Sequence, residues 1–245
     1  MPKAVRTPRA RRARAELPAG EYARYDLDRG RRTGVPEIVL GEGKSVDHLL
    51  GLMRAMAKAG HGAIVSRPTA RQLRALRAAA AEGLPLDFLA RDRLVRLRGP
   101  LGTVPVRGTI ALLSAGTADV PVAEEAAALL EALGVELVRS HDVGVAGIHR
   151  LERALRRVER RRPAAYIVFA GREGALPTVV AGLVHAPVIG VPVSVGYGRG
   201  GRGTAALLAM LQSCAPIAVV NIDAAVPAAL FAVQLLAARD RGRPG

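Results

Sequence analysis

The chain of 245 residues has no tryptophan, only three phenylalanines and four tyrosines, and a single cysteine, Cys214. The shortage of aromatic rings argues against a protein that stacks unpaired bases on aromatic side chains. One cysteine excludes an internal disulfide framework and a cysteine-rich metal site, and it is typical of a reducing compartment, so we expect a cytoplasmic protein. The two long uncharged stretches, 174–198 and 203–222, contain proline, which excludes a continuous membrane-spanning helix.

Acidic residues are too few to balance the basic ones, because 21 Asp and Glu face 36 Lys and Arg, for a formal net charge of +15. Much of the excess lies at the ends: residues 1–14 hold six basic and no acidic side chains, and residues 239–245 hold three arginines against one aspartate. We expect residues 1–16 and 239–245 to be disordered tails that contact nucleic acid only non-specifically. No apolar segment follows the basic start, so no secretion signal is expected.

The C-terminal part, residues 103–238, alternates short β-branched runs with Ala- and Leu-rich helical stretches. Strands are predicted at 109–114, 136–141, 165–170, 188–191 and 218–222, and helices at 122–133, 148–160, 176–184, 204–213 and 226–238. Apolar strands without polar alternation predict burial on both faces, and one helix between successive strands predicts a parallel sheet with right-handed crossovers. The predicted fold is a doubly wound, flavodoxin-like three-layer α/β sandwich.

The N-terminal part, residues 17–98, predicts a smaller α/β domain. Its strands are expected at 37–40 and 63–66, its helices at 46–59 and 70–82, and a final strand or hairpin at 86–98. The Gly-Pro-Leu-Gly sequence at 99–102 is expected to form the hinge between the two domains.

Four of the predicted C-terminal strands are followed by glycine-rich turns that lead into helices. Because parallel strands end at one edge of a sheet, these turns should converge, and free N–H groups at helix starts favour phosphate. The turns also carry Asp119, Asp142, His149 and Glu173, which together favour a nucleotide site. Taken singly, each glycine is more often a turn residue and each acid more often a helix cap, and Asp119 precedes Val-Pro as a cap would.

Nine motifs occur together along the chain. They are SAGTADVPVAEE at 114–125, DVGVAGIHR at 142–150, AGREGALP at 170–177, SVGYG at 194–198, SCAP at 213–216 and VNID at 220–223, with DLDR at 26–29, RTGVPE at 32–37 and GEGK at 41–44 in the N-terminal part. With them, the chain from about Tyr22 to Ala238 resembles the LarB family, which makes the nickel-pincer nucleotide cofactor. That family is related to PurE, the phosphoribosylaminoimidazole carboxylase, which lacks the N-terminal domain and the Cys-Ala-Pro motif.

The resemblance implies a carboxylase and hydrolase that converts nicotinic acid adenine dinucleotide, CO₂ or bicarbonate, and water to pyridinium-3,5-biscarboxylic acid mononucleotide and AMP. An electron-poor pyridinium carbon does not attack CO₂, whereas a thiolate added to the ring turns the neighbouring carbon into an enamine nucleophile. The resemblance assigns Cys214 as that nucleophile, with acid and base roles for Glu173, Asp142, Asp119 and His149. It also implies Mg²⁺ at the pyrophosphate, held by ligands that the sequence does not identify. The implied substrate-binding residues are Ser114, Gly116, Thr117, Gly147, Arg150, Gly171, Gly174, Ser194, Gly196 and Tyr197.

Cys214 follows a predicted helix and precedes the fifth predicted strand, so it should lie at the sheet edge opposite the glycine turns. On spacing alone, a lone cysteine is most often a small buried hydrophobe. A thiol at the far edge cannot reach a ring bound at the turns of its own subunit. Either the turn at 213–216 wraps unusually, or a neighbouring subunit supplies the thiol, and the resemblance favours the second. Since the relatives form compact octamers, the resemblance implies a homo-oligomer, an octamer, with shared sites.

Two other functions stay open at this point. One is a PurE-type carboxylase or mutase acting on an aminoimidazole ribonucleotide, although Cys214 and the N-terminal domain argue against it. The other is a non-catalytic nucleotide-binding or nucleic-acid-binding protein, which the positive charge motivates.

Overall fold

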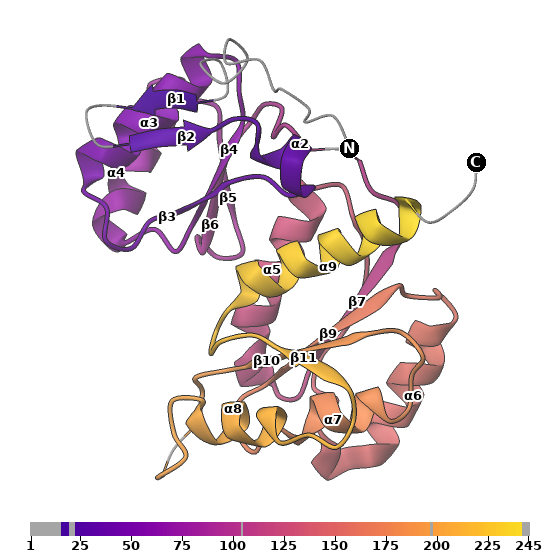
Figure 1. Ribbon diagram of the computed structural model, residues 1–245. Coiled ribbons are helices and arrows are strands. Elements are labelled where there is room, and N and C mark those ends of the chain that lie inside the picture. The colour runs from indigo at the N-terminus through magenta and orange to yellow at the C-terminus, as the bar shows by residue number, and fades with distance from the viewer. Residues whose placement is uncertain (1–15, 20–22, 104, 197, 242–245) are drawn as a thin grey trace, which may run out of the picture. The chain divides into compact units, whose positions relative to one another are not determined.

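The computed structural model describes residues 16–19, 23–103, 105–196 and 198–241 (Figure 1). The chain divides into two compact units, Met1–Val104 and Pro105–Gly245, and the division falls just after the predicted hinge at 99–102. The predicted basic N-terminal tail and residues 242–245 lie outside the described residues, except that Glu16 belongs to a strand.

The C-terminal unit is built on a five-stranded parallel sheet in the order β11-β10-β9-β7-β8. Its strands are β7 (Thr109–Ser114), β8 (Glu136–Ser140), β9 (Ala165–Ala170), β10 (Val188–Pro192) and β11 (Ile217–Val219). The order reverses direction between β7 and β9, as in flavodoxin-like folds. The predicted doubly wound α/β fold is confirmed.

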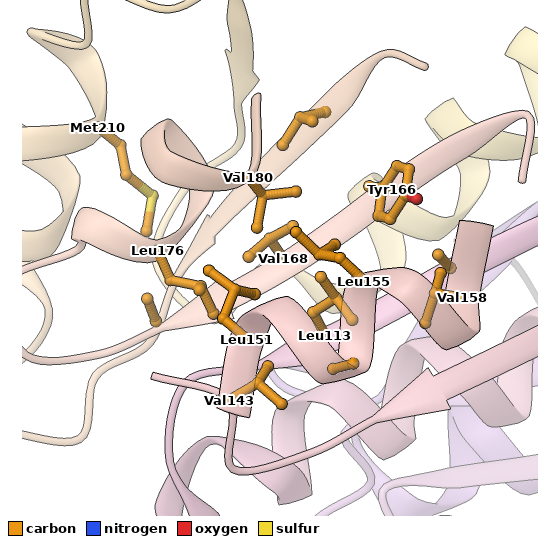
Figure 2. Close-up of a cluster of buried hydrophobic side chains, with 14 of the residues drawn as sticks. Leu113, Val143, Leu151, Leu155, Val158, Tyr166, Val168, Leu176, Val180 and Met210 are labelled. Carbon is orange, nitrogen blue, oxygen red and sulfur yellow. The ribbon is translucent and has the colours of Figure 1, made fainter. Parts of the chain in front are cut away.

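Helices cover both faces of this sheet. On one face lie α5 (Val120–Ala132) and α9 (Ala225–Arg241), and on the other α6 (Ile148–Glu159), α7 (Ala175–Ala181) and α8 (Thr204–Leu211). Side chains alternate across a strand, so Leu113 of β7 joins Leu151, Val168 and Leu176 in the core beneath α6 and α7 (Figure 2). A strand whose residues are all apolar therefore needs a helix on each face of the sheet to bury both sets of side chains.

The edge strands depart from the prediction of burial on both faces. Residues of the central strands β7, β9 and β10 are buried, whereas β11 is half-exposed and β8 is buried only at Ser140. β11 also begins and ends earlier than the predicted 218–222. Beyond its last residue, Val219, the chain stays beside β10, where the Val220 N–H donates to Gly190 O and the Asp223 N–H donates to Pro192 O.

The C-terminal tail prediction is wrong for residues 239–241, which form the last turn of α9. The Asp240 carboxylate accepts a hydrogen bond from the Arg107 N–H at 3.1 Å, which ties the helix end to the chain just before β7. None of the helices in the described part of the chain combines the length and hydropathy needed to cross a bilayer.

The N-terminal unit contains a four-stranded sheet in the order β3-β4-β6-β5, in which β3 (Ile38–Leu40) and β4 (Ala63–Ser66) are parallel. β5 (Leu86–Leu89) and β6 (Leu94–Leu97) are antiparallel, so the segment 86–98 is a hairpin rather than one strand. The helices α3 (Val46–Lys58) and α4 (Ala70–Ala81) pack with this sheet in one apolar core. The sequence does not predict the β1–β2 hairpin (Glu16–Ala19 and Ala23–Asp26) or the short helix α2 (Arg29–Thr33).

The three N-terminal motifs have structural roles in this unit. Arg32 makes two hydrogen bonds to the Asp26 carboxylate at 3.0 and 2.7 Å, and the Glu37 carboxylate accepts from the Asp26 N–H at 2.6 Å. The Gln72 amide donates to the carbonyls of Gly41 and Lys44 at 2.9 and 2.8 Å. These contacts hold the segment from β2 to α3 in place.

Candidate functional site

A pocket of about 540 Å³ lies at the carboxyl edge of the C-terminal sheet, where the strand order reverses. The turns after β7, β8, β9 and β10 line it with residues 115–119, 142, 144–146, 150, 170–173 and 195–196. This is the place where parallel sheets bind ligands, and the volume suits a small molecule. The predicted convergence of the glycine turns is therefore present in the structure.

Eight of the predicted site residues line this pocket, namely Gly116, Thr117, Asp119, Asp142, Arg150, Gly171, Glu173 and Gly196. Ser114 does not, because its side chain is fully buried and its Oγ lies 3.0 Å from His141 Nδ1. His149 is exposed on α6, and Ser194, Gly147 and Gly174 also lie outside the lining. Tyr197 lies outside the described residues.

Asp119 is the buried carboxylate of the pocket, with 5% of its surface exposed. It holds the N-cap position of α5, yet its side chain caps nothing there; its Oδ2 instead accepts from the Gly116 N–H at 2.8 Å. Burial raises the pKa of Asp119, the negative charges of Glu173 and Asp223 raise it further, and the Gly116 hydrogen bond lowers it. A carboxyl group with a raised pKa in a pocket is suited to acid–base chemistry.

Asp142 and Arg150 form an ion pair in the pocket wall, with 2.7 Å between Oδ2 and Nη1. Asp142 has a φ of 56°, a left-handed conformation that aspartate tolerates better than most residues. Unlike Asp119, Asp142 is exposed, and its negative charge is balanced by a neighbour. The pair therefore supplies a guanidinium for an anionic ligand rather than an isolated base.

Glu173 is exposed and lines the pocket beside the glycine turn that follows β9. That turn approaches its neighbours so closely that glycine is required at 171, where a Cβ would lie 2.6 Å from Val195 O and 2.9 Å from Asp119 Oδ1. The turn thus brings Glu173 into the same pocket as Asp119.

Cys214 lies elsewhere, in a second cavity of about 420 Å³ lined by Met210, Leu211, Ser213, Cys214, Ala215, Pro216, Ile217 and Val219. This cavity is at the amino end of β11, whose first residue Ile217 pairs with the first residue of β10, so it is at the edge opposite the pocket. The cysteine is exposed, contrary to the usual burial of a lone cysteine. The turn that carries it is held by Ser213, whose Oγ accepts from Thr178 Oγ1 and donates to Ala215 O, both at 2.9 Å.

The sequence analysis did not identify two residues that lie near the pocket, Asp223 and His141. Asp223 accepts a hydrogen bond from the Ser194 N–H at 2.9 Å and contributes to the raised pKa of Asp119. Asp223 is the last residue of the VNID motif, and its position after the fifth strand could have indicated that it lies near the pocket. His141 precedes Asp142 and had no local signal. Within the described residues, no three His, Cys, Asp or Glu side chains group as metal ligands.

Comparison with known proteins adds the family context. Residues 109–243 match the AIR carboxylase family, and residues 17–95 match the LarB/PurE-like N-terminal domain. An uncharacterized protein of Methanocaldococcus jannaschii is 40% identical over 215 residues, which is 86% of this chain and 83% of that protein. The N5-carboxyaminoimidazole ribonucleotide mutase of the same organism is 34% identical over 134 residues, 54% of this chain and 80% of the mutase. Among solved structures, PurE of Treponema denticola aligns with a TM-score of 0.42 at 22% identity, over 55% of this chain and 92% of that one.

Proposed function

This chain belongs to the AIR carboxylase family, as a LarB member related to PurE, and from that premise we propose that it carboxylates and cleaves nicotinic acid adenine dinucleotide in the cytoplasm. The products are pyridinium-3,5-biscarboxylic acid mononucleotide and AMP, an early step toward the nickel-pincer nucleotide cofactor. The observation that carries this proposal is the combination of the LarB/PurE-like N-terminal domain with an exposed Cys214 in the C-terminal unit.

Cys214 is proposed as the nucleophile. Its thiolate adds to a carbon of the pyridinium ring, and the ring loses its aromaticity. The neighbouring ring carbon becomes the nucleophilic carbon of an enamine and attacks CO₂. That carbon then carries both the new carboxylate and its original hydrogen. A base removes the proton, the carbon–sulfur bond breaks, and the thiolate leaves as the ring becomes aromatic again.

Glu173 is proposed as that base, because it is an accessible carboxylate in the pocket. Asp119, whose pKa is raised by burial, is proposed to hold or return a proton at the same place. The guanidinium of Arg150 is proposed to bind a phosphate, in which case Asp142 keeps it oriented into the pocket until the substrate arrives. His149, exposed on α6 outside the lining, is given no step in this scheme.

Mg²⁺ is proposed at the pyrophosphate, and the pocket suits it. Magnesium prefers oxygen ligands and is commonly held by one or two carboxylates together with substrate phosphates. Asp142 offers such an oxygen in the lining and has no proton-transfer step in this scheme. The ion would neutralise phosphate charge while a water molecule cleaves the anhydride.

A neighbouring subunit is proposed to bring Cys214 to the pocket, since the two cavities share no lining residue. Exposed apolar side chains on this part of the chain support a partner: Leu183, just after α7, and Leu208 and Leu211 of α8 are 59%, 55% and 61% exposed, and Leu211 lines the same cavity as Cys214. We propose a homo-octamer with sites shared between subunits.

A PurE-type activity is the second candidate, favoured by the identity with the N5-carboxyaminoimidazole ribonucleotide mutase. One assay separates the two. The protein is incubated with bicarbonate, MgCl₂ and either nicotinic acid adenine dinucleotide or an aminoimidazole ribonucleotide, in its free and its N5-carboxylated forms, and the nucleotides are separated by chromatography. AMP and a new mononucleotide formed only from the dinucleotide support the proposal; turnover of the aminoimidazole ribonucleotide without AMP formation supports the PurE-type candidate.

A further inference from the structure

A continuous chain of polar contacts runs beside the pocket without lining it. Ser114, the last residue of β7, has its Oγ 3.0 Å from His141 Nδ1, and the other ring nitrogen, Nε2, lies 3.2 Å from Glu124 Oε1 on α5. The Ser114 contact is a hydrogen bond, whereas the contact between Nε2 and Glu124 is at ion-pair distance without a hydrogen bond, so the Ser114 hydroxyl is the group that orients the ring. His141 therefore joins three elements: β7, the end of β8, and α5.

Charged side chains lie near His141 at ion-pair distances from one another. Arg139 Nε lies 3.4 Å from the same Glu124 oxygen, and Arg139 Nη2 lies 2.7 Å from Glu131 Oε1. Ser114 is fully buried, which makes the loss of its partner costly. The buried Ser114 hydroxyl thus holds the Nδ1 end of the His141 ring.

The position of His141 matters because Asp142 is the next residue. The two following N–H groups, of Val143 and Gly144, donate to Ser114 O and Ala115 O at 3.1 and 2.8 Å. The turn that aims Asp142, with its left-handed φ of 56°, is therefore tied to the end of β7 by two backbone contacts and one side-chain contact. Without the side-chain contact, the two backbone contacts after Asp142 are left to hold the turn to the end of β7.

We propose that His141 is a positioning residue, which acts through Asp142 by holding the turn after β8 against Ser114 and so keeping the Asp142–Arg150 pair in the pocket. The kinetic part of this inference rests on the proposed function, whereas the geometric part does not. Neither His141 nor Ser114 touches the ligand in this scheme.

The kinetic test compares three variants. His141→Leu, which loses both contacts, should lower kcat/KM for nicotinic acid adenine dinucleotide roughly ten- to hundredfold, as expected when a substrate-positioning group is misplaced. His141→Asn carries a polar atom near the position of Nδ1 and should restore part of that loss. In an Asp142→Asn background, His141→Leu should have no more than about a twofold further effect, because the two residues act on one step. His48→Leu, on the exposed surface of α3, is the matched control.

The geometric test is a pair of crystal structures, of the wild type and of His141→Leu, with Ser114→Ala as a second variant should His141→Leu not fold. The proposal expects the Asp142 Oδ2–Arg150 Nη1 contact of 2.7 Å to open in the variant. An unchanged contact overturns it, and so does a kinetic loss that persists in the Asp142→Asn background. If the wild type fails to turn over the dinucleotide, the proposed function has failed and the crystal structures alone decide the role of His141.

Discussion

Arg150 Nη1 lies 2.7 Å from Asp142 Oδ2. The carboxylate that the sequence analysis assigns an acid–base role is therefore paired with the guanidinium that it assigns to phosphate binding. Both side chains line the pocket. The pairing makes Arg150 a preoriented cation whose partner an incoming phosphate can replace.

Replacing Arg150 by Gln should weaken substrate binding. A hydrogen bond to a charged group contributes about 1.5–3 kcal/mol, so KM for the dinucleotide should rise roughly ten- to hundredfold with a smaller change in kcat. Steady-state kinetics measure both constants. Arg153→Gln, three residues along α6 and outside the pocket lining, is the control; equal effects of the two variants would contradict a local role for Arg150.

Asp119→Asn should stabilise the protein and inactivate it. The pKa of Asp119 is raised by burial, so the folded state disfavours its charged form, and this penalty is present above that pKa and disappears as the pH falls through it. The amide carries no charge and keeps an oxygen for the Gly116 N–H. We expect Tm to rise by roughly 2–4 °C at pH 8, with the difference shrinking on acidification, while kcat falls about 10²–10⁴-fold. A lower Tm at pH 8 would show that the charge is stabilising.

Gly171→Ala should damage the pocket. A Cβ there would meet Val195 O at 2.6 Å, and backbone cannot move away as a flexible side chain does. We expect a loss of at least about tenfold in kcat/KM and a lower Tm. Gly51→Ala, inside α3 with nothing within 4 Å of the added Cβ, should instead stabilise the fold by about 0.5–1 kcal/mol. Thermal melts of both variants, with kinetics, make the comparison; normal activity of Gly171→Ala would refute the close approach.

Cys214→Ala and Cys214→Ser should fold normally and fail to carboxylate. The side chain is exposed, so its removal should change the free energy of unfolding by less than about 0.5 kcal/mol. A hydroxyl is a much poorer nucleophile and leaving group at the ring, so the serine variant should be as inactive as the alanine variant. Chromatographic detection of the carboxylated product measures this. Turnover by either variant would contradict the covalent step.

Two inactive variants should restore activity when they exchange subunits. Cys214 and Glu173 belong to cavities at opposite edges of the sheet, so a mixed assembly contains some sites with an intact residue from each partner. Mixing Cys214→Ala with Glu173→Gln after reversible dissociation should recover up to about a quarter of wild-type turnover for a site shared by two subunits. An active monomer in sedimentation, or no recovery despite demonstrated exchange, would contradict sharing.

Local pattern predicts the centre of the C-terminal fold well. β7 and β9 match their predicted bounds, because runs of four apolar residues in β7 and six in β9 leave little choice of register. β11 is misplaced because an edge strand has one neighbour, and its end depends on its pairing with that neighbour alone. The sequence analysis missed the hairpin and helix at residues 16–33. This segment is rich in polar residues, which is typical of a loop. The contacts that order it, among Asp26, Arg32 and Glu37, are tertiary contacts that a local pattern does not indicate.

The site is predicted at the level of loops and less well at the level of side chains. Topology alone brings the four turns together. Whether a side chain enters the pocket depends on its position in the strand and on its neighbours: Ser114 turns inward to His141, whereas Asp119 reaches back over its own turn to Gly116. Neither contact has a periodic signature, and the same holds for the influence of Asp223 on Asp119.

The most direct test of the proposed function is a mass analysis of the nucleotides formed from nicotinic acid adenine dinucleotide, ¹³C-labelled bicarbonate and MgCl₂. We expect a mononucleotide that carries the label as a second ring carboxylate, together with an equal amount of unlabelled AMP. AMP without a labelled mononucleotide would show hydrolysis of the dinucleotide and contradict its carboxylation. An unchanged dinucleotide would contradict the proposed function altogether.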